Sequence, residues 1–203
     1  MPGPNFFNRL GLFVVKDFFD PRLCTRFRSE MCSSPRTSAL VVDGNTFLEK
    51  VKKDVRRTKE AGISATTVSF VKDRLAALKP MLENHFNVAL IGCEKPQFLV
   101  YNEGDFFRPH QDGDDNASKP EYITKRQVSV VMFLNDADQE SGPESYGGGA
   151  LTFYGLIDDP PWKQCAFPLM SELGLLIAFR SNIVHEVRPV TRGERYTITS
   201  WFF

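Results

Sequence analysis

Apolar positions in the first half of the chain recur at the spacing of an α-helix. The clearest pattern lies between residues 68 and 86, where apolar side chains stand three or four positions apart: Val68, Val71, Leu75, Leu78 and Leu82. This spacing predicts an amphipathic helix with one buried face. Lys79-Pro80 falls inside the pattern, and proline removes one backbone hydrogen bond of a helix, so we expect a kink there.

A strand and a shorter helix are predicted before it. Gly11 to Phe19 contains an apolar stretch that favours a short strand. Asp20 then suits a helix N-cap, and the proline that follows it suits the first helical position. This helix is expected to end near residue 32, because Ser33-Ser34-Pro35 breaks the pattern. Leu40 to Val42 is a further candidate strand, before a turn at Asp43-Gly44-Asn45.

From Pro96 onward the pattern changes to short β-rich segments separated by turn residues. The predicted strands are Gln97–Tyr101, Gln127–Leu134, Ala150–Tyr154, Leu173–Phe179, Ile183–Val187 and Tyr196–Phe203. Such a series is typical of a sandwich or barrel. We see no linker and no internal repeat. We therefore expect one folding unit of α+β class, mainly β, in which residues 1–95 pack on a core formed by residues 96–203.

Composition narrows the class of protein. The chain has 203 residues, 42% of them hydrophobic, enough for one sizeable core. Lys plus Arg and Asp plus Glu are 25 each, and nucleic-acid binders usually carry a basic excess. No apolar run approaches a membrane span, and the stretch Leu10–Val15 is too short for a signal-peptide core. We expect a cytoplasmic protein that binds neither nucleic acid nor membrane.

The four cysteines, Cys24, Cys32, Cys93 and Cys165, lack the paired spacing of zinc sites. Reduced and mostly buried thiols are the favoured interpretation, with one disulfide pair as the alternative.

The candidate chemistry centres on His110, Asp112 and His185. On an extended strand, residues i and i+2 point to the same side, so His110 and Asp112 can reach one ion together. His185 must then come from another strand. Two imidazoles and one carboxylate suit a divalent metal of intermediate softness, and they leave one side of the ion open, as in non-haem Fe(II) oxygenases. Zinc can use the same ligands, so ligand type alone does not choose the metal. The third histidine, His85, lies near a predicted helix end and is read as structural.

Other segments fall in a fixed order around these ligands. They are Tyr101–Phe107, Arg126–Asn135, Gly148–Phe153 and Pro189–Trp201, the last with Arg195. Together the segments resemble the 2-oxoglutarate/Fe(II)-dependent dioxygenase superfamily, and most of all its prolyl 4-hydroxylase-like branch. The resemblance covers about residues 96–203. It implies a double-stranded β-helix, or jelly roll, and a site that uses Fe(II), 2-oxoglutarate and O2, with ascorbate as a candidate reductant.

Arg195 has a clear physical role under this resemblance. A dicarboxylate needs a planar two-donor cation at its far end, and guanidinium provides one. In similar enzymes this arginine holds the C5 carboxylate of 2-oxoglutarate, and residues like Thr199 and Tyr101 help to line the pocket. Strand alternation places Arg195, Thr197, Thr199 and Trp201 on one face. Phe133 departs from those relatives that have a cosubstrate-binding tyrosine, because phenylalanine cannot donate a hydrogen bond. Phe179 and Trp201 are interpreted first as packing residues, and Gly148-Gly149 as a tight strand start.

The reaction implied is hydroxylation of an unactivated C–H, with 2-oxoglutarate decarboxylated to succinate and CO2. Halogenating relatives replace the carboxylate ligand with a small residue, and this chain keeps Asp112. A prolyl residue of a peptide or protein is the leading substrate. A free amino acid or another small molecule is the alternative, because fold and metal site do not decide among substrates. A non-catalytic, metal-holding binding or sensing module is the rival from another class.

Two polar loops are predicted to flank the metal, at residues 113–124 and 136–147. Their acidic residues are Asp114, Asp115, Glu121, Asp136, Asp138, Glu140 and Glu144. One hypothesis is a mobile rim that attracts a positively charged substrate. The alternative is a pair of solvated connections. A third insertion, residues 158–167, is a candidate wall of the substrate groove.

Overall fold

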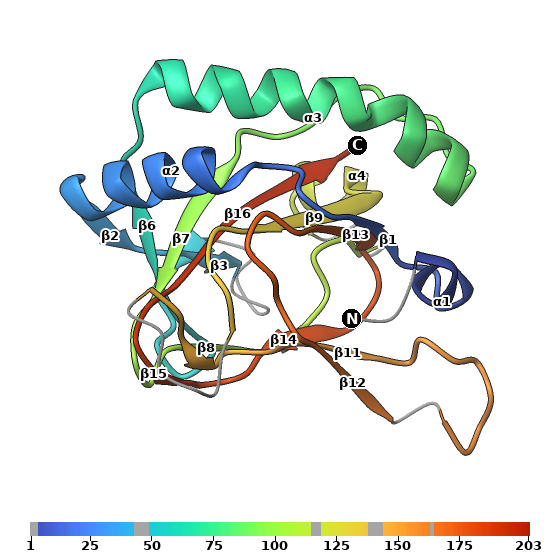
Figure 1. The fold of residues 1–203 in the computed structure, drawn as a ribbon. Helices are drawn as coiled ribbons and strands as arrows, with labels where there is room; N and C mark the ends of the chain where they lie inside the picture. The colour runs from blue at the N-terminus through green and yellow to red at the C-terminus, as the bar shows by residue number, and fades with distance from the viewer. Residues whose placement is uncertain (1–3, 43–48, 115–118, 138–143, 163–164) are drawn as a thin grey trace.

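Two antiparallel sheets lie face to face in the computed structural model, and two long helices cover the larger sheet (Figure 1). The structure describes residues 4–42, 49–114, 119–137, 144–162 and 165–203. Helices α1 (Pro4–Arg9), α2 (Pro21–Ser33) and α3 (Ala65–Phe86) come before the jelly-roll strands, and α4 (Glu121–Lys125) lies among them. The arrangement confirms the predicted jelly-roll core with N-terminal supporting helices. Among the described helices, none is both long and apolar enough to cross a bilayer.

The larger sheet contains seven strands over the described residues. Their order is β1 (Phe13–Val15), β13 (Leu176–Arg180), β9 (Val128–Phe133), β16 (Arg195–Phe202), β7 (Gln97–Tyr101), β6 (Lys59–Ala61) and β2 (Arg36–Ser38). Three of these strands precede residue 96 in the chain, so the N-terminal part extends the same sheet. The division into residues 1–95 and 96–203 stays a prediction.

The smaller sheet contains five described strands. Their order is β12 (Ala166–Leu169), β11 (Leu151–Tyr154), β14 (His185–Val187), β8 (Phe106–His110) and β5 (Arg56–Arg57). Two further pairs join β10 (Gly147–Gly148) to β15 (Val190–Arg192), and β3 (Val41–Val42) to β4 (Glu49–Lys50). The smaller sheet lies on the side of the larger sheet away from α2 and α3 (Figure 1).

Local sequence signals explain both covering helices. The Asp20 carboxylate accepts the Leu23 amide at 2.9 Å, which caps α2 as predicted. The Ser64 hydroxyl accepts the Thr67 amide and starts α3, and Asn87 ends it in the left-handed region at φ 50°. The helix continues through Pro80. Its apolar face is buried against the sheet, through Val71, Leu75, Leu78, Leu82 and Phe86.

The larger sheet separates two clusters of buried side chains. Alternation along β16 sends Tyr196, Ile198 and Phe202 toward α2 and α3. The opposite face of the same strand looks between the two sheets, where a second apolar cluster includes Phe133 and Phe179. One strand therefore supplies both the packing under the helices and the interior wall of the jelly roll.

Most predicted strands are confirmed, with shifts at their ends. The strands predicted from Leu173 and Ile183 begin later, at Leu176 and His185. Strands β2, β5 and β6 were not predicted. They are two or three residues long and rich in charge, so they carry little apolar alternation.

The cysteine prediction is partly wrong. All four thiols are free, but Cys24 alone is buried, and Cys32 and Cys165 are exposed.

Candidate active site

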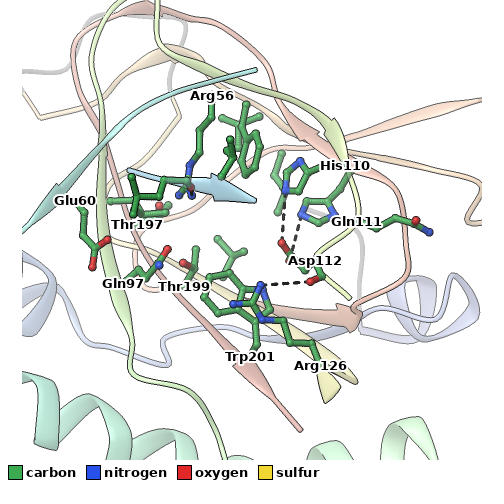
Figure 2. A pocket seen from close by; sticks show the side chains of 18 of the residues that line it. Arg56, Glu60, Gln97, His110, Gln111, Asp112, Arg126, Thr197, Thr199 and Trp201 are labelled. Atoms are coloured by element: carbon green, nitrogen blue, oxygen red, sulfur yellow. Dashed lines mark hydrogen bonds and ion pairs between the residues drawn. The ribbon is translucent and has the colours of Figure 1, made fainter. Parts of the chain in front are cut away.

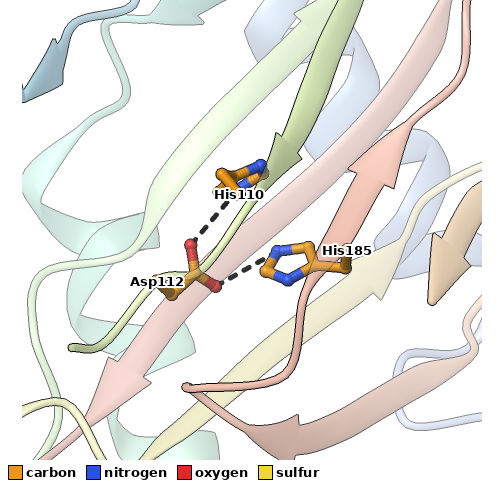
Figure 3. A group of neighbouring side chains, drawn as sticks. All are labelled: His110, Asp112 and His185. Carbon is orange, nitrogen blue, oxygen red and sulfur yellow. Dashed lines mark ion pairs between the residues drawn. The ribbon is translucent and has the colours of Figure 1, made fainter. Parts of the chain in front are cut away.

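His110, Asp112 and His185 meet between the two sheets, as the sequence predicts (Figure 3). Strands β8 and β14 pair with His185 opposite His110. One ligand atom from each of the three residues lies within 4.8 Å of the others. The Asp112 carboxylate lies 3.5 Å from His110 Nε2 and 3.4 Å from His185 Nε2. Two nitrogens and an oxygen are therefore close enough to share one ion.

The placement of Asp112 differs from the prediction. Strand β8 ends at His110, so Asp112 lies beyond the strand and not on its alternating face. Backbone hydrogen bonds hold it instead, because the amides of Asp112 and Gly113 both donate to the Ser181 carbonyl, at 3.0 and 2.9 Å. A Cβ at Gly113 would lie 2.5 Å from the Arg126 carbonyl oxygen, so this turn requires glycine.

The two imidazoles are oriented by backbone carbonyls. His110 Nδ1 lies 2.8 Å from the Arg108 oxygen, and His185 Nδ1 lies 2.9 Å from the Ile183 oxygen. A carbonyl oxygen accepts only, so each Nδ1 carries the proton and each Nε2 presents a lone pair. Backbone contacts of this kind fix the tautomer of a metal-binding histidine.

Trp201 contacts the carboxylate ligand, although the sequence indicated packing for it. Its indole N–H donates to Asp112. The Arg126 guanidinium lies 3.8 Å from the centre of a Trp201 ring. Glu94 in turn holds Arg126 through two hydrogen bonds of 2.6 and 2.8 Å. Figure 2 shows Trp201 and Arg126 together beneath Asp112. The sequence held one signal for this contact, because strand alternation places Trp201 on the same face of β16 as Arg195.

Arg195 lies in the same interior, and its side chain is 1% exposed. Its Nη1 is 3.4 Å from Thr197 Oγ1, whereas Nε and Nη2 have no hydrogen-bond partner among the described residues. Tyr101 and Phe133 flank the guanidinium, with ring centres 5.0 and 5.2 Å away. An unpaired buried cation is costly, so this arrangement favours an anionic ligand.

Two further buried polar atoms of this interior have no hydrogen-bond partner among the described residues. They are Thr199 Oγ1, a predicted pocket residue, and Gln97 Oε1, which the sequence did not single out. Thr199 and Gln97 are opposite each other in the pairing of β16 with β7. A cavity of about 480 Å³ is lined by both, and also by Arg195, Tyr101 and the three metal-ligand candidates. The structure thus brings every predicted site residue to one cavity.

The comparisons with known proteins agree with this geometry. A model of the 2OG-Fe(II) oxygenase superfamily matches residues 96–203. The chain belongs to this superfamily. The superfamily is defined by Fe(II) and 2-oxoglutarate (2OG), used with O2, and the histidine–aspartate–histidine group of this member can hold a metal.

Relatives with curated names are PKHD-type hydroxylases. One from Maricaulis maris is 27% identical, and the match covers 79% of this chain and 65% of the relative. One from a Synechococcus strain is 31% identical, with 81% and 62% covered. The chain therefore spans a little less than two thirds of the length of these relatives.

Solved structures share the fold of this superfamily member. A Pseudomonas putida prolyl-4-hydroxylase aligns with TM-score 0.68 at 21% identity, over 95% of this chain and 91% of that one. A Trichoplax adhaerens prolyl hydroxylase, solved with a hypoxia inducible factor peptide fragment, aligns with TM-score 0.72 at 19% identity. That alignment covers 98% of this chain and 86% of the other. The predicted likeness to the prolyl 4-hydroxylase-like branch is confirmed.

The charge states suit a divalent cation. Burial tends to raise the pKa of Asp112, but His185, His110 and the Trp201 N–H outweigh it and hold that pKa well below its usual range. Burial lowers the pKa of His185 to about 4, although Asp112 opposes the shift. At neutral pH the site therefore offers an ionised carboxylate and a neutral imidazole, the forms that bind metal.

One of the two polar loops reaches the cavity. Lys119, Tyr122 and Ile123, from the segment at residues 113–124, line it. The last two lie on α4, so part of the segment predicted as a loop is a short helix. The described residues of the loop at 136–147 and of the insertion at 158–167 do not. Asp115, Asp138 and Glu140 lie outside the described residues.

The described acidic side chains of these loops already have partners. Asp114 is 2.5 Å from Lys119, Glu121 is 2.6 Å from Lys125, and Glu144 pairs with Arg28. Asp136 accepts the Leu173 amide at 2.7 Å.

Proposed function

We propose that this chain is an Fe(II)- and 2-oxoglutarate-dependent dioxygenase that hydroxylates a prolyl residue of a peptide or protein. One observation carries the proposal: three side chains that can hold a metal line the same cavity as a buried arginine, two of whose nitrogens have no partner among the described residues. Neither feature stabilises the fold by itself, because each gathers polar groups away from water without pairing them fully. Both are explained if the cavity binds a metal and a dicarboxylate.

In this proposal His110, Asp112 and His185 hold Fe(II) and leave positions open on the cavity side. When bound, the iron supplies O2 activation coupled to decarboxylation of 2-oxoglutarate. The backbone carbonyls behind the imidazoles keep both Nε2 atoms aimed at the ion. Trp201 restricts rotation of the Asp112 carboxylate through its N–H. The retained carboxylate favours hydroxylation over halogenation.

Arg195 positions the cosubstrate in this proposal. Its Nε and Nη2 have no partner among the described residues, and a carboxylate accepts such a pair of donors in parallel. Thr199 Oγ1 offers one more donor from the same strand face. The rings of Tyr101 and Phe133 keep water from the guanidinium, and the lower local dielectric strengthens the ion pair. Phe133 therefore contributes by packing rather than by hydrogen bonding.

The proposal of a prolyl substrate is supported by the similarity of this fold to solved prolyl hydroxylases. Two of the structures with this fold are described as prolyl hydroxylases, and one of them was solved with a peptide fragment bound. The cavity is large enough for a side chain beside a small dicarboxylate, because ligand sites usually occupy about 300–1,000 Å³. Free amino acids are the second substrate class to test.

The proposal is tested by incubating the protein with Fe(II), 2-oxoglutarate and ascorbate under air. Proline-containing peptides, free amino acids and buffer alone form the separate arms. We expect succinate in every arm, the most with an accepted peptide, and one added oxygen on proline by mass spectrometry. Asp112→Ala is the matched control. Product on a free amino acid alone would replace the peptide assignment, and absence of succinate in every arm would favour a binding module.

A further inference from the structure

A second arginine lies on the wall of the same cavity. Arg56, on β5, is 8% exposed, and its Nε has no hydrogen-bond partner among the described residues. Its Nη1 donates to the Leu40 carbonyl at 2.9 Å. No carboxylate of the described residues forms an ion pair with it. Figure 2 shows the side chain reaching into the cavity from β5.

The other charges on the cavity wall are already accounted for. Arg126 is held by Glu94, and Lys119 by Asp114. Arg195 and Asp112 belong to the proposed cosubstrate and metal sites. The remaining carboxylate, Glu60, also lines the cavity and forms no ion pair with Arg56. Arg56 is therefore a nearly buried cation that the proposed reaction does not use and no described acid neutralises.

Arg56 is also close to the metal ligands. Its guanidinium carbon lies 4.7 Å from the centre of the Phe107 ring. The same ring stacks on the candidate metal ligand His110, with centroids 3.5 Å apart and planes inclined by 18°. One aromatic ring thus separates the Arg56 cation from a metal ligand. An anion bound by Arg56 would lie at the edge of the reaction centre, beside the route to the metal.

We propose that Arg56 binds a carboxylate of the substrate, so that the accepted peptide carries an acidic group close to its target proline. This inference rests on the proposed function and specifies its substrate class. Guanidinium is suited to the task because its planar donors match a carboxylate, and partial burial strengthens the pair. The negative charge proposed for the substrate is opposite to the positive charge expected from the acidic loops. The described carboxylates of those loops already pair with other groups of the protein.

The test measures peptide binding separately from turnover. Peptides with one proline and blocked termini are made in pairs, with Asp or Glu near the proline in one member and Asn or Gln in the other. A further peptide has a free C-terminal carboxylate as its sole acid, which separates side-chain from terminal carboxylates. Affinity is measured without O2 on protein loaded with Mn(II) and 2-oxoglutarate. We expect at least one acidic peptide to bind about tenfold more tightly than its neutral partner.

The variants are Arg56→Gln, Arg56→Lys and the matched control Arg57→Gln. Arg57 is the next residue of β5, but it is exposed, stacks on Phe106 and does not line this cavity. Arg56→Gln should abolish the preference for the acidic peptide and leave affinity for the neutral one unchanged. Arg56→Lys should keep part of the preference, and Arg57→Gln all of it. Thermal melting and Mn(II) affinity confirm that each variant is folded.

The outcomes separate the two proposals. Equal binding of acidic and neutral peptides, or an equal effect of Arg56→Gln on both, overturns the role of Arg56. Weaker 2-oxoglutarate binding in Arg56→Gln assigns it to the cosubstrate and also overturns the inference. Acid-dependent binding through Arg56 without oxygen added to proline keeps Arg56 as the site for a substrate carboxylate and rejects proline as the target. Hydroxylation of neutral and acidic peptides with equal efficiency keeps the prolyl assignment and rejects the role of Arg56.

Discussion

The two faces of strand β16 differ in what they bury. Toward α2 and α3 the strand presents Tyr196, Ile198 and Phe202, which join a mainly apolar cluster. Toward the cavity it presents Arg195, Thr197, Thr199 and Trp201. Arg195 and Thr199 keep polar atoms that have no partner in the described part of the chain. Apolar burial stabilises the fold, whereas unsatisfied polar burial opposes it. The cavity face is therefore where ligands, rather than packing, are expected to complete the structure.

The largest effect is expected at the metal ligands. Asp112→Ala removes one ligand of three and the only anionic one, so turnover should be abolished and metal affinity mostly lost. The fold should persist, because a loop beyond β8 carries the residue. Succinate release and Mn(II) titration measure the two effects. Full activity of this variant without added metal would contradict the assignment.

Arg195→Ala should act mainly on the cosubstrate. Losing a bidentate contact to a buried carboxylate costs about 2–5 kcal/mol, so the KM for 2-oxoglutarate should rise by roughly 30-fold or more. Metal affinity should change little, and Arg195→Lys should rescue in part. The melting temperature without cosubstrate should not fall as it would for a packing residue, since an unpaired buried charge is removed. An unchanged KM would place the cosubstrate elsewhere.

Ile198→Ala tests the face of β16 that packs against the helices, opposite the cavity face. This fully buried side chain packs under the helices, so its truncation should lower the free energy of unfolding by about 2–5 kcal/mol. The KM for 2-oxoglutarate of the folded protein should stay close to that of the parent. Urea unfolding and steady-state kinetics provide the two measurements. A large KM change with normal stability would mean that the faces are not separable in this way.

Trp201→Phe tests a smaller contribution. Phenylalanine keeps an aromatic ring against Arg126 but removes the N–H that reaches Asp112, so metal affinity should fall by about 10- to 100-fold. Trp162→Phe is the matched control, because the chain has two tryptophans and Trp162 is 54% exposed. Mn(II) or Co(II) titration reads the effect without turnover. Equal metal affinities in the two variants would return Trp201 to a packing role.

The parts that could be predicted depend on residue type and short spacing. The combination of two histidines, an aspartate and an arginine is rare, and its chemistry can be inferred from the sequence: His110, Asp112, His185 and Arg195. Polar and apolar residues alternate along β16, so the sequence also shows which of its residues share a face. The strand argument for Asp112 was wrong in detail, because β8 ends at His110 and Asp112 lies beyond the end of the strand. Gly113 and Ser181, which hold that turn, carried no signal that identified them in advance.

The resemblance of the sequence motifs indicates the superfamily and the jelly-roll class, and side-chain chemistry indicates the candidate metal ligands and the arginine expected to bind an anion. Sequence motifs and side-chain chemistry are local properties of the chain, so they can be recognised before it folds. The tertiary structure is needed to see that Trp201 donates to Asp112, that Gln97 is opposite Thr199, and that Arg56 reaches the cavity with no acidic partner among the described residues. These relations join strands distant in the chain, and whether a buried polar atom is satisfied depends on everything folded around it.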